Sequence, residues 1–143
     1  MPTSPRVLVV EDDPAIRALL VAALQRAGLG VDGAHDGVAA LEHLAGNEYA
    51  VLLVDLMMPR MNGFAFIDSL ATLPLRVKPV VFVMTAFDDA AFRQLDSALV
   101  HGCFRKPFDV EQVVELVRDC ADLLREGRPD ARPDDARERA SVC

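Results

Sequence analysis

Short apolar runs alternate with longer segments of helical periodicity along most of the chain. The first run, residues 6–10, is continuously apolar after Arg6, which is typical of a strand covered by helices on both faces. Asp13 and Pro14 then indicate a helix start, with a carboxylate at the N-cap and a proline in the first turn. Apolar side chains recur at helical spacing until Gly28, where we expect this helix to end.

The same alternation continues to about residue 126. We predict strands at residues 31–34, 49–54, 79–84 and 103–105, and helices at about 37–45, 63–70 and 88–99 and from 110 onward. These segments make five β/α units in strict succession. Strict alternation predicts an α/β fold with one doubly wound parallel sheet between two layers of helices, a three-layer α/β/α arrangement.

The composition is compatible with a single folded domain, because 52% of the 143 residues are apolar. We place this domain at residues 1–126. Residues 127–143 are polar and lack an apolar stripe, so we expect a disordered tail or linker there. The net charge is −7, and the tail contains four basic and four acidic residues, so the excess acid belongs to the domain. Without clustered Lys and Arg, we expect no direct contact with nucleic acid.

The amino-terminal sequence has no signal-peptide pattern, and no apolar stretch approaches the length of about 18 residues that a membrane span needs. We therefore expect a cytoplasmic protein that makes no membrane contact.

Polar residues follow the predicted strands at the points where ligands bind in open parallel sheets, the carboxyl ends of the strands. Glu11 and Asp12 follow the first strand, Asp55 the third, Thr85 the fourth and Lys106 the fifth. At an effective dielectric constant of about 20, two carboxylates about 4 Å apart repel by roughly 4 kcal/mol, so such a cluster should bind a cation or a proton. Hard oxygen ligands favour Mg²⁺ or Mn²⁺.

A carboxylate beside such a cation is suited to attack phosphorus and form an acyl phosphate. The transferring group carries negative charge on its oxygens, which a metal, the Lys106 ammonium and the Thr85 hydroxyl would together bind. Lysine is rare in this chain, which has thirteen arginines and only two lysines, so the lysine at position 106 favours a specific role. The residue types therefore predict phosphoryl transfer to a carboxylate of this cluster.

Four strings, VLVVEDDPAIR, VDLMMPRMNGF, VMTA and RKPF, occur in an order and at separations that resemble the response-regulator receiver family over about residues 5–126. The resemblance implies the flavodoxin-like strand order 2-1-3-4-5. It also implies a signalling phosphoacceptor that catalyses only its own phosphorylation and dephosphorylation, and a cis peptide bond between Lys106 and Pro107.

The resemblance further implies roles for individual residues. Asp55 would be the phosphoacceptor, Asp12 a direct metal ligand, Glu11 a ligand acting through water, and the Met57 carbonyl a backbone ligand. Thr85 would be the switch hydroxyl, and Lys106 would contact the phosphoryl group.

The sequence departs from the family pattern in the last strand. Three positions before the lysine the family usually has Tyr or Phe, whereas this chain has Cys103, followed by Phe104. Either the coupling to Thr85 is altered, or Phe104 takes part through a shifted strand. We expect phosphorylation to change the face formed by the fourth helix, the fifth strand and the fifth helix.

The implied partners are a sensor histidine kinase or phosphotransfer protein, and a downstream protein or a detached effector domain. The resemblance leaves open whether the chain forms a homodimer on phosphorylation.

One alternative function is that of a pseudo-receiver, which binds proteins without carrying phosphate. Two others are enzymes of similar topology. An aspartate-dependent phosphatase needs a second acid where Met57 stands, and an FMN protein needs a phosphate loop where Glu11 and Asp12 stand. The chain also lacks the GxxxxGK nucleotide loop.

Overall fold

The structure is a computed structural model that describes residues 6–56, 63–75, 78–85 and 100–125. Its elements in chain order are β1 (Arg6–Val10), α1 (Pro14–Arg26), β2 (Gly30–Ala34), α2 (Gly37–Gly46), β3 (Val51–Asp55), α3 (Gly63–Thr72), β4 (Val80–Thr85), β5 (Gly102–Arg105) and α5 (Val110–Arg125). The helix predicted at about 88–99 and the tail predicted at 127–143 lie outside the described residues.

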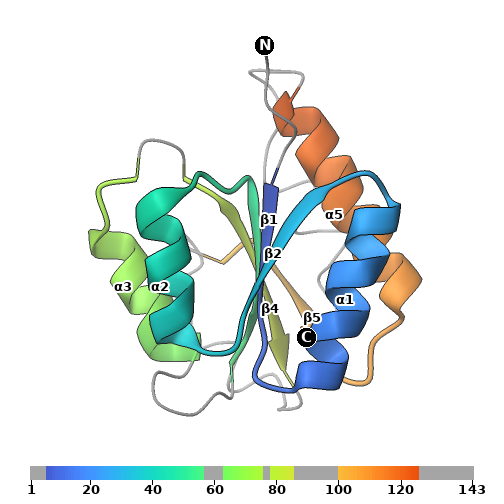
Figure 1. The fold of residues 1–143 in the computed structure, drawn as a ribbon, viewed down its shortest axis with the longest axis horizontal. Coiled ribbons are helices and arrows are strands. Elements are labelled where there is room, and N and C mark those ends of the chain that lie inside the picture. Colours follow the sequence, from blue (N-terminus) through green and yellow to red (C-terminus); the bar gives the residue numbers. More distant parts are fainter. Residues whose placement is uncertain (1–5, 57–62, 76–77, 86–99, 126–143) are drawn as a thin grey trace.

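The five strands form one parallel sheet in the order β2-β1-β3-β4-β5. Helices α1 and α5 cover one face of this sheet, and α2 and α3 cover the other (Figure 1). The predicted doubly wound α/β fold and its strand order are therefore confirmed. Because all the strands run in the same direction, their carboxyl ends lie along one edge of the sheet.

Two apolar clusters fill the spaces between the sheet and its helix layers. Successive strand residues point to opposite faces, so β3 contributes Val51 and Leu53 to one cluster and Leu52 and Val54 to the other. All five residues of β3 are buried, which explains why this strand is continuously apolar until it ends at Asp55. The two clusters fix the sheet between its helices and so position the loops at its carboxyl edge.

Capping residues set the start and end of α1. The Asp13 carboxylate accepts hydrogen bonds from the backbone N–H groups of Ala15 at 2.8 Å and Ile16 at 3.2 Å. The prediction that Asp13 caps this helix is confirmed. After the helix, Gly28 has a φ of 92°, a conformation that favours glycine and that reverses the chain toward β2.

Within the described ranges, no helix is both long enough and apolar enough to cross a membrane.

Candidate functional site

Three carboxylates meet at the carboxyl edge of the sheet. One oxygen from each of Glu11, Asp12 and Asp55 lies within 4.8 Å of the other two. Glu11 and Asp12 follow β1, and Asp55 ends the neighbouring strand β3. Glu11 is fully buried and Asp55 is 3% exposed, whereas Asp12 is exposed to solvent. The cluster is therefore a group of acids with one side open to water.

The ammonium group of Lys106 reaches this cluster from the end of β5. Its Nζ lies 2.7 Å from Oε1 of Glu11 and 3.4 Å from Oδ2 of Asp55. The peptide bond between Lys106 and Pro107 is cis, as predicted. The backbone N–H of Lys106 donates to the carbonyl of Thr85 at 2.7 Å, which ties the end of β5 to the end of β4.

The charges in the cluster perturb one another. Burial raises the pKa of Glu11 to about 8, and the nearby Asp55 carboxylate acts in the same direction, while Lys106 opposes them. Burial lowers the pKa of Lys106, but contacts with Glu11 and Asp55 outweigh burial, so its pKa is raised above the usual value. Burial and Asp55 thus oppose the charged form of Glu11 more strongly than Lys106 favours it.

A divalent cation fits this donor set. The second carboxylate oxygen of Glu11, Oε2, is buried and has no hydrogen-bond partner among the described residues. A buried carboxylate oxygen without a partner is costly, and a cation is one way to satisfy it. The donors are hard oxygen atoms, as Mg²⁺ and Mn²⁺ prefer. The predicted backbone ligand, the carbonyl of Met57, lies outside the described residues.

Thr85 is fully buried at the end of β4. Its strand neighbours Val81 and Val83 belong to the cluster on the α2 and α3 face, so the alternation of the strand places the Thr85 side chain on that face. Cys103 belongs to the same cluster and pairs with Val83. Thr85 and Cys103 therefore lie on the same face of the sheet.

Phe104 lies on the opposite face. It packs against the cluster under α1 and α5, and its ring centroid lies 5.8 Å from that of Phe82. Of the two residues that the sequence offered as a switch, only Cys103 shares a face with Thr85.

Sequence reasoning missed one contact at the acidic loop. Arg17, in the first turns of α1, donates a hydrogen bond from Nη1 to the carbonyl of Glu11 at 2.7 Å. In the sequence, this arginine stands six positions after Glu11, in the string EDDPAIR. Helical side chains point toward the helix amino terminus, so this spacing is the one sequence signal for the contact.

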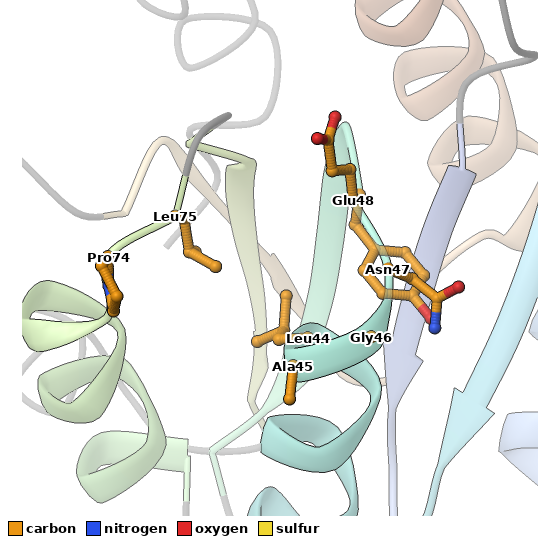
Figure 2. A pocket seen from close by; sticks show the side chains of 8 residues that line it. Leu44, Ala45, Gly46, Asn47, Glu48, Pro74 and Leu75 are labelled. Atoms are coloured by element: carbon orange, nitrogen blue, oxygen red, sulfur yellow. The ribbon is translucent and has the colours of Figure 1, made fainter.

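A second polar cluster lies near the opposite edge of the sheet. The Tyr49 hydroxyl donates to Oδ2 of Asp32 at 2.6 Å, and Arg6 Nη2 binds the same oxygen at 2.5 Å. Beside Tyr49, a hollow of about 320 Å³ lies between the loops that precede β3 and β4, with Leu44 and Leu75 on opposite sides (Figure 2). This hollow contains no part of the acidic cluster.

The fold and the acidic edge together define a class: a doubly wound α/β domain with carboxylates, a hydroxyl and an ammonium group at the ends of β1, β3, β4 and β5. The sequence profile of the response regulator receiver domain matches residues 7–118. The chain therefore belongs to the receiver domain family of two-component response regulators.

Individual relatives agree with this assignment. The response regulator MprA of Mycobacterium sp. strain KMS is 36% identical over 135 residues, which cover 90% of this chain and 54% of the relative. The same values hold for MprA of Mycobacterium sp. strain JLS. The chain thus spans about half the length of the curated relatives it matches.

Solved structures agree as well. The response regulator TrrA of Thermotoga maritima, determined in complex with Mg²⁺–BeF, has a TM-score of 0.70 and 27% identity, covering 81% of this chain and 98% of that one. The chemotaxis protein CheY4 of Vibrio cholerae, crystallised at low pH, has a TM-score of 0.75 and 27% identity, covering 82% of this chain and 99% of that one.

Proposed function

We propose that this chain accepts a phosphoryl group on Asp55 in a reaction that requires Mg²⁺ or Mn²⁺. The observation that carries the proposal is the convergence at one edge of the sheet. Lys106 contacts both Glu11 and Asp55, and the oxygens of Glu11, Asp12 and Asp55 lie within 4.8 Å of one another. The similarity to TrrA, which was solved with Mg²⁺–BeF, supports the choice of ligands.

Each residue has a chemical task in this proposal. An Asp55 oxygen forms a bond to phosphorus while the bond from phosphorus to the donor breaks, and its electron pair leaves with the donor. Glu11 and Asp12 hold the cation, together with the carbonyl of Met57. When bound, the cation neutralises charge on the phosphoryl oxygens and the acids. Lys106 pairs with a phosphoryl oxygen, because its ammonium lies 3.4 Å from Asp55.

The phosphoryl donor in this proposal is a sensor histidine kinase or a phosphotransfer protein. The similarity to response regulators such as MprA supports this partner. Those relatives are about twice as long as the matched region, so we propose that a downstream protein or an effector domain receives the signal. Thr85 would bind the new phosphoryl group and, through the face that it shares with Cys103, change the surface near β5.

The decisive experiment incubates the protein with acetyl phosphate and Mg²⁺ and measures the mass of the intact chain. We expect one added phosphoryl group, and none with EDTA or in Asp55→Asn. Asp13→Asn is the matched control, since it removes a carboxylate from the same loop while retaining a helix cap.

Two results would contradict the proposal. If Asp55→Asn gains the group as fully as the parent chain, the acceptor is wrong. If the parent chain binds Mg²⁺ but gains no group from acetyl phosphate or from a kinase, the chain is a pseudo-receiver that acts by protein binding alone.

A further inference from the structure

The loop that joins β1 to α1 carries two of the three acids, and its backbone is held on both sides of Glu11. The Glu11 N–H donates to the carbonyl of Ala34 at the end of β2 at 3.0 Å. The Glu11 carbonyl accepts from Nη1 of Arg17 at 2.7 Å. That carbonyl belongs to the peptide unit that links Glu11 to Asp12, so its orientation sets the direction in which the Asp12 side chain leaves the backbone.

Arg17 is placed to hold this peptide unit. Its backbone N–H donates to the carbonyl of Asp13 at 2.9 Å, which puts it in the first turns of α1. Side chains of a helix lean toward its amino terminus, so the Arg17 guanidinium lies over the loop that precedes the helix. A hydrogen bond from a charged donor is stronger than one between neutral groups.

Gly33 on the edge strand β2 leaves room for the Arg17 stem. A Cβ at position 33 would lie 3.2 Å from Cδ and 3.3 Å from Cγ of Arg17, and 3.5 Å from Cγ2 of Val21. Contacts of 3.2 and 3.3 Å are shorter than ordinary van der Waals separations, so a side chain at this position would require the Arg17 stem to shift by a few tenths of an ångström. The Arg17 side chain can therefore follow this path because residue 33 has no side chain.

We infer that Arg17 is a positioning residue. Its side chain passes through the space beside Gly33 and holds the Glu11–Asp12 peptide, so that both acids face the cation. The inference rests on the proposed metal-dependent function and adds a residue to it. Arg17 touches neither the acids' carboxylates nor the phosphoryl group in this role. Its effect should therefore be seen in metal affinity, apart from the chemistry at Asp55.

The test measures binding of Mn²⁺ by electron paramagnetic resonance to the full chain, to four single variants and to one double variant. We expect Arg17→Gln to raise the Mn²⁺ dissociation constant by about tenfold, as is typical when a group that orients a metal ligand is removed. Arg17→Lys keeps a cationic donor and should recover part of the affinity. Arg26→Gln is the matched control, since it removes the same charge from the last turn of the same helix and should bind as the parent chain does.

Gly33→Val tests the link without changing any charge. Valine suits a strand, so the sheet itself should tolerate it, but its side chain would displace the Arg17 stem. We expect a loss of affinity similar to that of Arg17→Gln, and no further loss when the two changes are combined, because both act through one contact. Urea unfolding of each variant in EDTA confirms that the chain is folded during the binding measurement.

The outcomes separate this inference from the proposed function. Equal Mn²⁺ affinity in Arg17→Gln and Arg26→Gln would overturn the positioning role, and so would fully additive effects of Arg17→Gln and Gly33→Val. Phosphorylation of the parent chain by acetyl phosphate and by a kinase is measured in parallel. If the parent chain gains no phosphoryl group while Arg17→Gln still loses affinity, the proposed function fails and the positioning role stands.

Discussion

Glu11 and Lys106 are 95 positions apart in the chain, yet a carboxylate oxygen of the first lies 2.7 Å from the ammonium nitrogen of the second. The contact spans the sheet from the interior strand β1 to the edge strand β5, with β3 and β4 between them. Glu11 is fully buried, and among the described residues Lys106 is the cation that pairs with its carboxylate. Because these two groups are in contact, a change of pH, a bound metal ion or a substitution of either residue should alter the site.

The first prediction concerns pH in the absence of metal. The pKa of Glu11 is raised from 4.5 to about 8 in the folded chain. A carboxyl group with a raised pKa stabilises the folded state fully below about pH 4.5, and this contribution is lost as the pH rises toward about 8. Relative to Glu11→Gln, the free energy of unfolding of the parent chain should therefore fall by about 2 kcal/mol between about pH 5.5 and 7.5.

Urea unfolding in EDTA over this pH range measures the difference. With Mg²⁺ present, the fall should be smaller, because the cation binds the charged form of Glu11. Parallel curves for the two chains in EDTA would show that Glu11 does not titrate in this range.

The second prediction separates two adjacent acids. The Asp13 carboxylate accepts from two backbone N–H groups of α1, whereas an oxygen of Asp12 lies in the acidic cluster. Asp13→Ala should lower the free energy of unfolding by about 1 kcal/mol, and Asp13→Asn should preserve it, since asparagine is also a good N-cap. Neither change should alter Mn²⁺ affinity, whereas Asp12→Asn should weaken it. Loss of metal affinity in Asp13→Asn would make Asp13 a ligand.

The fold was predictable because parallel strands buried on both faces are continuously apolar. Strand β3 illustrates the precision of such a prediction. The apolar run indicated a strand from residue 49, whereas the strand begins at Val51. Tyr49, just before the strand, donates from its hydroxyl to Asp32 on β2. The prediction placed Asp55 directly after the strand, and in the structure it is the last strand residue.

The site was predictable to the extent that it consists of side chains at strand ends. Glu11, Asp55 and Lys106 stood out because charged groups followed apolar runs. The contact from Arg17 was not predictable in this way, because its acceptor is a backbone carbonyl, which every residue possesses. The positions of Cys103 and Phe104 on opposite faces depended on the register of β5, and this register is set by pairing with β4.

The third prediction concerns the buried hydroxyl at the end of β4. Thr85→Val keeps the shape of the side chain and removes the hydroxyl. We expect this variant to accept a phosphoryl group but to lose the amide resonance shifts of β5 that beryllofluoride and Mg²⁺ produce in the parent chain, since the hydroxyl is the group proposed to bind the phosphoryl oxygens. Thr85→Ser should retain the shifts. An unchanged response in Thr85→Val would remove Thr85 from the switch.

The last prediction concerns the polar cluster away from the acids. Tyr49 is buried and donates to Asp32 at 2.6 Å. Burial raises the pKa of Tyr49, and Asp32 adds to this, so the phenol remains a donor across the ordinary pH range. Tyr49→Phe should lower the free energy of unfolding by about 2 kcal/mol, the usual cost of losing a hydrogen bond to a charged group.

Arg6→Gln is the comparison for this change. Arg6 also binds Asp32, but its side chain is 42% exposed, so its loss should cost less than the loss of the Tyr49 hydroxyl. Both variants should gain the phosphoryl group from acetyl phosphate as fast as the parent chain, because the cluster lies away from the carboxyl ends of the strands. Slower phosphorylation in folded Tyr49→Phe would mean that the two edges of the sheet are coupled.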